Sequence, residues 1–133
     1  MDRLTIGKLA AETGVKITTI RYYERTGLML PPSRSAGRHR MYTDDQRRRL
    51  FFICKARELE FSIEEIRTLL VFAEPGNRSC REVQHVAAAH LQKLRRKISV
   101  LAKLEALLAE ALAHCSGKPS SPCPVLELLD AAD

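Results

Sequence analysis

Residues 79–115 read SCREVQHVAAAHLQKLRRKISVLAKLEALLAEALAHC and predict one long helix, to about Ala113, that decides the fold. Ser79 is a helix-capping residue, and Glu82, three positions later, completes a capping box. One cysteine, Cys80, stands just inside the start of this helix, and another, Cys115, stands just past its end. At a rise of about 1.5 Å per residue, an unbroken helix separates these two thiols by roughly 50 Å, so they cannot share a ligand within one chain.

The long helix carries an apolar stripe with heptad-like spacing. Its members are Leu94, Ile98, Leu101, Leu108 and Leu112. Only Glu105 interrupts the stripe, and the other predicted helices are too short to cover it. The pattern therefore favours a coiled-coil homodimer over an internal core helix, although the heptads alone leave its orientation open. An antiparallel pair would bring Cys80 of one chain beside Cys115 and Cys123 of the other.

Composition and charge limit the function classes. With 133 residues, 45% hydrophobic and 29% charged, the chain is expected to be globular with one modest core. It contains no apolar run of about 20 residues and no signal-peptide pattern, so we expect a cytoplasmic protein without a membrane partner. In that compartment, cysteines are expected to serve as metal ligands or reactive thiols rather than as a disulfide framework.

The positive charge belongs to the N-terminal part. Residues 1–60 contain 13 Lys/Arg and 7 Asp/Glu, whereas residues 61–133 contain 9 of each, so the net charge of +6 lies in the first part. A basic module joined to a neutral remainder indicates a polyanionic partner. Charge alone fits a solvated basic face equally well, so the order of the predicted helices and strands has to distinguish between these two interpretations.

Two short helices are predicted near the N-terminus. Thr5 caps the first, which ends at Gly14, and Thr18 caps the second, which Gly27 stops. Helices joined through a glycine turn form a helix-turn-helix, whose second helix fits a major groove. In that second helix Ile20 and Tyr23 are expected to face the core. The side chains expected on its outer face are Thr19, Arg21, Tyr22 and Arg25, which suit phosphates and base edges.

A β-hairpin wing and two further helices are predicted next. The wing covers residues 34–42 around Gly37, and its arginines would grip the DNA backbone. Thr43 caps a helix that runs to about Glu60, and Ser62 with Glu65 forms a capping box for a helix over residues 63–73. Beyond the long helix, Gly117 and three prolines shape a loop that would hold Cys115 and Cys123 in a chelating arrangement. A short apolar turn or helix is expected over residues 125–129.

Four motifs carry a resemblance to a known family: LTIGKLA (residues 4–10), IRYYERTGL (20–28), RHRMY (38–42) and FSIEEI (61–66). They resemble the MerR family of transcriptional activators. The resemblance implies a mainly α fold with a winged helix-turn-helix domain and connecting helices (1–74), an antiparallel coiled-coil dimerisation helix (79–114), and a metal-binding loop with a short helix (115–133). It implies a homodimer that binds promoter DNA and, with its effector, bends and untwists that DNA for RNA polymerase. The implied DNA contacts are Thr18, Thr19, Arg21, Tyr22, Arg38, Arg40 and Tyr42.

The same resemblance places the metal ligands at Cys80, Cys115 and Cys123, with Cys80 from the partner chain. Thiolates select soft or borderline ions. The family's copper, silver and gold sensors carry serine in place of Cys80, so its presence favours a divalent ion. Three thiolates suit mercury or lead, whereas zinc usually takes a fourth ligand, for which His114 is a candidate. Mercury therefore ranks first, ahead of lead, cadmium and zinc, although the loop between Cys115 and Cys123 is one residue shorter than in the family's mercury sensors.

Other functions receive less support from the residues. A thiol-redox switch, with a disulfide between Cys115 and Cys123, stays open as an alternative, although the chain lacks the four clustered cysteines of the family's iron–sulfur sensors. No residue set offers a nucleophile with its base, so an enzyme is not expected. Cys54 lies in the apolar run FFIC (residues 51–54) and is interpreted as a packing residue.

Overall fold

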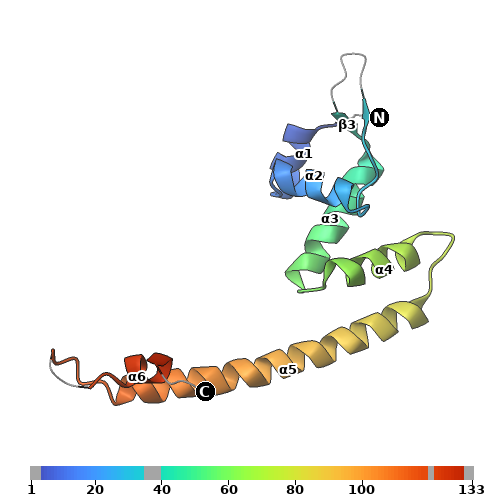
Figure 1. Cartoon of the computed structure of the whole chain (residues 1–133). Coiled ribbons are helices and arrows are strands. Elements are labelled where there is room, and N and C mark those ends of the chain that lie inside the picture. Colours follow the sequence, from blue (N-terminus) through green and yellow to red (C-terminus); the bar gives the residue numbers. More distant parts are fainter. Residues whose placement is uncertain (1–3, 35–39, 120–121, 131–133) are drawn as a thin grey trace. The chain divides into compact units, whose positions relative to one another are not determined.

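The computed structural model describes residues 4–34, 40–119 and 122–130 (Figure 1). Its elements, in chain order, are β1 (Leu4–Thr5), α1 (Ile6–Thr13), α2 (Ile17–Arg25), β2 (Ser33–Arg34), β3 (Arg40–Tyr42), α3 (Asp44–Glu58), α4 (Ile63–Ala73), α5 (Cys80–Ala113) and α6 (Pro124–Asp130). The expected mainly helical architecture is confirmed. No helix among the described residues is both long enough and apolar enough to cross a membrane.

By its internal contacts the chain divides once, into Met1–Val83 and Gln84–Asp133. In the first unit the glycine turn forms as predicted, since Gly14 has φ 73° and its amide donates to the Ala10 carbonyl at 2.9 Å. The predicted cap at Thr18 is wrong. α2 begins two residues earlier, at Ile17 with Lys16 as its cap, because the Lys16 carbonyl already accepts from the amides of Thr19 and Ile20, both at 3.0 Å.

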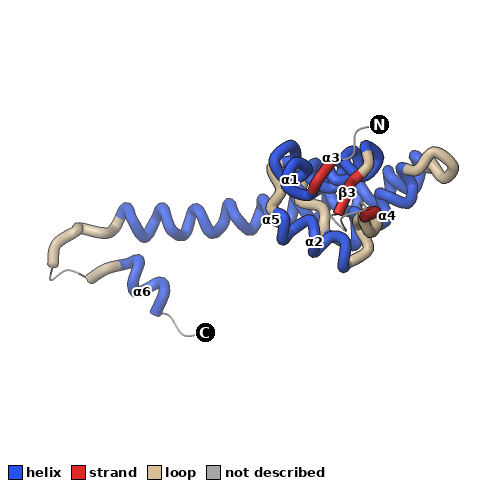
Figure 2. The backbone as a smooth tube through the Cα atoms, turned by 90° about the horizontal axis from the view of Figure 1, so that it is seen from above, coloured by secondary structure: helices blue, strands red, loops and turns tan. Residues whose placement is uncertain are grey.

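The three short strands form one antiparallel sheet in the order β1-β3-β2 (Figure 2). β2 pairs with β3 through Ser33 and Met41, which confirms the predicted hairpin. β1 was not predicted; it adds a third strand by pairing Leu4 with Tyr42. The hairpin connection, residues 35–39, lies outside the described residues.

Side-chain caps start three of the helices as predicted. The Thr5 hydroxyl accepts from the Lys8 amide, and reciprocal capping boxes start α3, with Thr43 and Gln46, and α4, with Ser62 and Glu65. The core beneath these helices contains Leu9, Ile20, Tyr23, Leu28, Met29, Tyr42, Leu50, Ile53, Ala56, Ile66 and Leu70. The core therefore joins the helices α1, α2, α3 and α4 and strand β3 into one body, and the outer face of α2 lies on its surface.

In the second unit α5 continues without a break to Ala113, which confirms the predicted long helix. Its start is capped as predicted, because the Ser79 hydroxyl accepts from the Glu82 amide at 3.3 Å. α6 lies beside the last turns of α5, and Ala111 is buried there. The predicted turn or helix over residues 125–129 is thus a helix one residue longer at each end.

Candidate nucleic-acid interface and metal centre

The outer face of α2 presents the side chains predicted to meet DNA. Thr18, Arg21 and Tyr22 are exposed and Thr19 is half-buried. Tyr22 is 44% exposed, and its ring lies 6.0 Å from the ring of buried Tyr23 at an interplanar angle of 54°. The face therefore combines hydroxyls, a phenol and a guanidinium above a rigid core.

Tyr42 requires a correction. Its side chain has 0% exposure, and its hydroxyl donates to Glu24 Oε2 at 2.6 Å. In this conformation the ring has no surface to offer DNA, so Tyr42 supports α2 from inside. The expected wing contact at Arg38 lies outside the described residues, and only the backbone of Arg40 is described, paired with Arg34 in the sheet.

Two polar side chains that the sequence did not single out hold the segment after α2. Arg49 Nε donates to the Leu28 carbonyl at 2.6 Å, and Gln46 Nε2 donates to the carbonyls of Leu30 and Pro31, both at 3.4 Å. Gln46 is 9% exposed and lies four residues before buried Leu50, on the same face of α3. This position on the apolar face is the sequence feature that could have predicted a buried, hydrogen-bonded Gln46. These bonds connect α3 directly to the backbone that follows α2.

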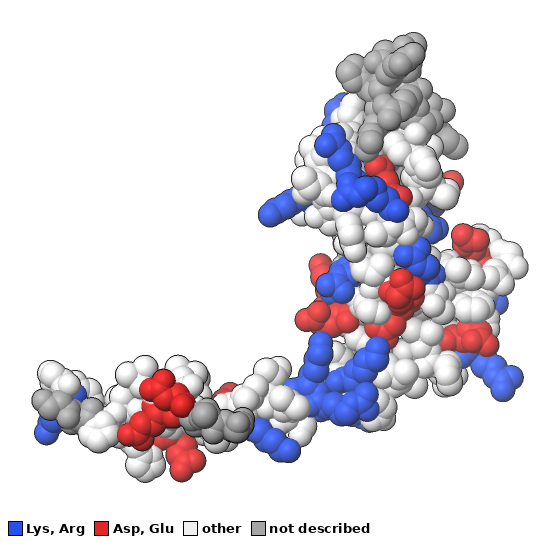
Figure 3. All heavy atoms as spheres, viewed as in Figure 1, with Lys and Arg blue, Asp and Glu red and all other residues white. Residues whose placement is uncertain are grey.

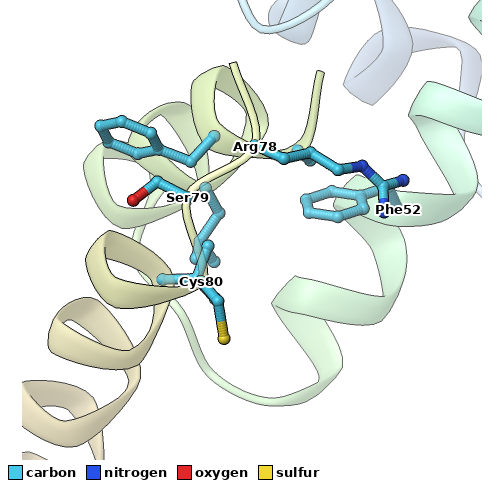
Figure 4. A pocket seen from close by; sticks show the side chains of 8 residues that line it. Phe52, Arg78, Ser79 and Cys80 are labelled. Carbon is cyan, nitrogen blue, oxygen red and sulfur yellow. The ribbon is translucent and has the colours of Figure 1, made fainter. Parts of the chain in front are cut away.

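Cys80 is exposed in the first turn of α5, where it lines a cavity of about 340 Å³ (Figure 4). The other lining residues are Phe52, Leu69, Phe72, Ala73, Arg78, Ser79 and Val83. Phe52 comes from α3, and Leu69, Phe72 and Ala73 come from α4. One expected metal ligand therefore stands next to apolar side chains of the two helices that follow the wing.

The other two expected ligands flank the loop after α5. Cys115 is exposed, and its amide donates to the Leu112 carbonyl at 3.1 Å; Cys123 is half-buried, and its carbonyl accepts from the Glu127 amide at 2.9 Å. Gly117 supplies the bend between them with φ 72°. All four cysteines of the chain are free thiols. Within residues 4–34, 40–119 and 122–130 of this single chain, no three metal-binding side chains come together, so the grouping of Cys80 with the loop cysteines stays a prediction.

His114 is held in a defined orientation. Its Nδ1 lies 2.9 Å from the Glu110 carbonyl oxygen. Because a carbonyl only accepts, Nδ1 carries the proton in this bond, and Nε2 of the neutral ring is left with the lone pair that a metal requires. A metal-bound histidine commonly donates its other ring N–H to a backbone carbonyl in this way, so His114 keeps its place as a candidate ligand.

Cys54 behaves as the predicted packing residue. It is half-buried against the core, and burial raises the pKa of its thiol, with the Glu58 carboxylate adding to the effect. A raised pKa keeps the thiol protonated near neutral pH, and a protonated thiol is a poor nucleophile and a poor metal ligand. Burial likewise raises the pKa of the neighbouring Tyr23 hydroxyl.

Comparisons with known proteins cover nearly the whole chain. The family model described as MerR HTH family regulatory protein matches residues 4–71, and the model described as MerR, DNA binding, matches residues 47–111. Heavy metal-dependent transcription regulator 1 of Rhizobium meliloti is 37% identical over 122 residues, which are 91% of this chain and 83% of that protein.

Two solved structures combine a similar fold with more than 30% sequence identity. The transcription regulator PbrR691 from Ralstonia metallidurans, in complex with lead(II), has a TM-score of 0.76 and 32% identity, covering 95% of this chain and 98% of that chain. The dual function transcriptional regulator MerR from Bacillus megaterium, in complex with mercury(II), has a TM-score of 0.67 and 31% identity over the same shares of both chains.

Proposed function

The chain belongs to the MerR family of helix-turn-helix regulatory proteins, and from this premise we propose that it is a metal-responsive transcriptional regulator that acts on promoter DNA as a homodimer. Members of this family are DNA-binding regulators and not enzymes. Such a function requires a protein in the cytoplasm, where promoter DNA and RNA polymerase are found.

The observation that carries the proposal is the exposed apolar stripe of α5, which lies between two free thiols. Ile98, Leu101 and Leu112 are 65%, 62% and 59% exposed in the single chain. Burying a side chain of this size stabilises an assembly by about 1.5–3 kcal/mol, so an uncovered stripe is a strong drive to associate. A second copy of the same helix supplies a stripe of the same length and spacing.

An antiparallel pairing of these stripes also completes the metal site. Cys80 begins α5 in one protomer, and the partner subunit's Cys115 and Cys123 would lie at the same end of the pair. Each dimer would then contain two sites of three thiolates. This donor set fits soft divalent ions, and the relatives named for lead and mercury complexes support a metal effector of this kind.

Mercury is our first choice of effector, since three thiolates match its low coordination number, and lead follows. The orientation of His114 favours a second candidate. If its Nε2 joins the three thiolates, the four-ligand set suits zinc or cadmium. The relatives include both a lead complex and a mercury complex at nearly equal identity, so the order of preference rests on the ligand count in this chain.

Control of transcription would follow from joining the two protomers at both ends of their long helices. Cys80 begins α5 and closely follows α4, so ligation there constrains the segment that connects α5 to the DNA-binding unit. The angle between the two DNA-binding units of the dimer is then the two-state element that the effector biases. Bending and untwisting promoter DNA costs a few kcal/mol, an amount that such a bias can supply.

The test is run-off transcription from the protein's own promoter with mercury, lead, cadmium, zinc and copper(I) at buffered free concentrations. We expect activation by a divalent thiophilic ion, loss of activation in Cys80→Ser with promoter binding retained, and normal activation in the control Cys54→Ala. Activation by peroxide in metal-free buffer would establish the redox alternative instead. Activation by none of the ions would refute the proposal.

A further inference from the structure

The middle of α5 carries a run of cations with no carboxylate close by in the sequence. Between Glu82 and Glu105 the chain contains five Lys/Arg and no Asp or Glu. Four of the five form what we call the central basic cluster: Lys93, Arg95, Arg96 and Lys97. The cluster lies at the midpoint of a helix that runs from Cys80 to Ala113.

The central basic cluster is exposed and largely unneutralised. All four side chains are exposed, and Figure 3 shows blue side chains gathered over this part of α5, with red ones toward its C-terminal end, where α6 also lies. With the other described residues, the side chains of Arg95, Arg96 and Lys97 form no ion pair or hydrogen bond. Lys93 lies three and four positions before Arg96 and Lys97, which is the spacing at which like charges on a helix repel each other.

Dimer formation increases this repulsion. In an antiparallel pair of equal helices, the two midpoints lie nearest the two-fold axis, so both copies of the cluster meet there. The partner's midpoint has the same composition and brings no carboxylate. The axis of a symmetric regulator also passes through the centre of its operator, since the two half-sites are related by the same rotation. The cations of both chains therefore gather on the axis that runs through the centre of the DNA site.

We infer that the central basic cluster binds backbone phosphates of the promoter between the two half-sites, as a third point of DNA contact on the dimer. This inference rests on the proposed antiparallel dimer. Successive helical residues point about 100° apart, so the four side chains leave α5 in different directions, and only the side of Leu94 and Ile98 is occupied by the seam. Whichever side of the pair faces DNA, one or two cations from each helix point toward it, which gives about two to four phosphate contacts per dimer.

The test compares two charge-matched variants of the full-length protein. The cluster variant is Arg95→Gln, Arg96→Gln and Lys97→Gln; the control is Lys55→Gln, Lys103→Gln and Lys118→Gln, which removes the same charge at exposed positions outside the cluster. Glutamine is a good helix former, and sedimentation confirms that each variant remains a dimer. Affinity for a promoter duplex is measured without metal from about 50 to 300 mM salt, together with a hydroxyl-radical footprint.

Each lost phosphate contact reduces the slope of log K against log salt by about 0.9. The cluster variant keeps Lys93, so it loses about one DNA-facing cation from each helix. We therefore expect it to lose about 2 units of slope, at least tenfold affinity at low salt, and protection at the promoter centre, while the half-sites stay protected. Slopes and footprints equal to those of the control would overturn the inference, as would an effect that appears only when RNA polymerase is added. Failure of the proposed function has a different signature, since the wild-type protein would then lack metal-dependent transcription or a dimeric state.

Discussion

The hydroxyl of Tyr42 donates a 2.6 Å hydrogen bond to Glu24 Oε2, and this bond joins strand β3 of the wing to helix α2. Tyr42 is fully buried, and its strand also pairs with both β1 and β2. The helix that is predicted to face DNA and the wing are therefore positioned relative to each other by an interior contact as well as by the chain between them. A change at this bond acts on stability first and on DNA binding only through the position of α2.

Replacing Tyr42 by Phe is expected to lower the free energy of unfolding by about 1–2 kcal/mol, because the carboxylate loses a donor while the ring still packs. Urea unfolding followed by circular dichroism measures this change. Tyr22→Phe is the matched control: Tyr22 is 44% exposed, so we expect a change in stability below about 0.5 kcal/mol together with weaker promoter binding. A Tyr42→Phe protein with normal stability and much weaker DNA binding would show that this hydroxyl contacts DNA after all.

The raised pKa of Cys54 predicts a loss of stability at alkaline pH. A thiol whose pKa is higher in the folded chain than in the unfolded one stabilises the fold below the unfolded pKa of about 8.5, and that contribution is lost as pH rises toward the folded pKa. Between about pH 8 and 10, the free energy of unfolding should fall more steeply in the wild type than in Cys54→Ala. Denaturation series with chelator and reductant measure both profiles. Parallel profiles would mean that Cys54 ionises alike in both states.

Much of the fold was predictable because its signals are local. Thr43 and Ser62 cap helices through atoms three residues away, and Gly14 ends α1 through its own backbone, so short motifs suffice. The buried state of Tyr42 was not predictable, because a tyrosine in a short strand faces either side, and the choice depends on Glu24, eighteen residues earlier. β1 was missed for the same reason, since two residues become a strand only by pairing with β3.

The candidate metal site was predictable only in part. Residue spacing alone placed Cys80 at the start of α5 and put Cys115 and Cys123 on either side of the loop after it. The expectation that these cysteines form no disulfide framework agrees with their free thiols. Their proposed grouping would depend on a second copy of α5, which the contacts of one chain cannot supply. The bond that orients His114 was also beyond the sequence, since it requires the backbone carbonyl of Glu110 at the end of α5.

The exposed stripe on α5 predicts that one charge on it dissociates the proposed dimer. Leu101→Glu would place two carboxylates in the apolar seam, close to the two-fold axis, where burial of an unpaired charge costs several kcal/mol. Sedimentation velocity at micromolar concentration should then show a monomer. Lys103→Glu is the control, because Lys103 lies on the opposite side of the helix, and it should remain dimeric. A dimeric Leu101→Glu protein would mean that another surface holds the chains together.

His114→Gln separates three-ligand from four-ligand metal binding. If three thiolates alone hold the ion, mercury affinity should be unchanged in this variant; if Nε2 also binds, zinc and cadmium affinity should fall about 10-fold or more. Competition with chromophoric chelators at pH 7 measures both. Ala113→Gln introduces the same amide one position away and should change neither affinity. Equal losses for mercury and zinc would indicate that the substitution disturbs the loop rather than removing a ligand.

Mixed dimers test whether the site is shared between chains. One subunit carries Cys80→Ser, and the other carries Cys115→Ser with Cys123→Ser, so neither homodimer has a complete site. In an antiparallel pair, one end of the heterodimer combines Cys80 from the second subunit with Cys115 and Cys123 from the first, and it should bind one ion with near wild-type affinity. Differently tagged subunits allow the heterodimer to be purified, and its stoichiometry to be measured by titration. The length of α5 keeps Cys80 and Cys115 of one chain apart, and each subunit of the heterodimer lacks at least one of the three thiols, so restored binding can come only from a site shared between the chains. A heterodimer without metal affinity would rule out the intersubunit arrangement.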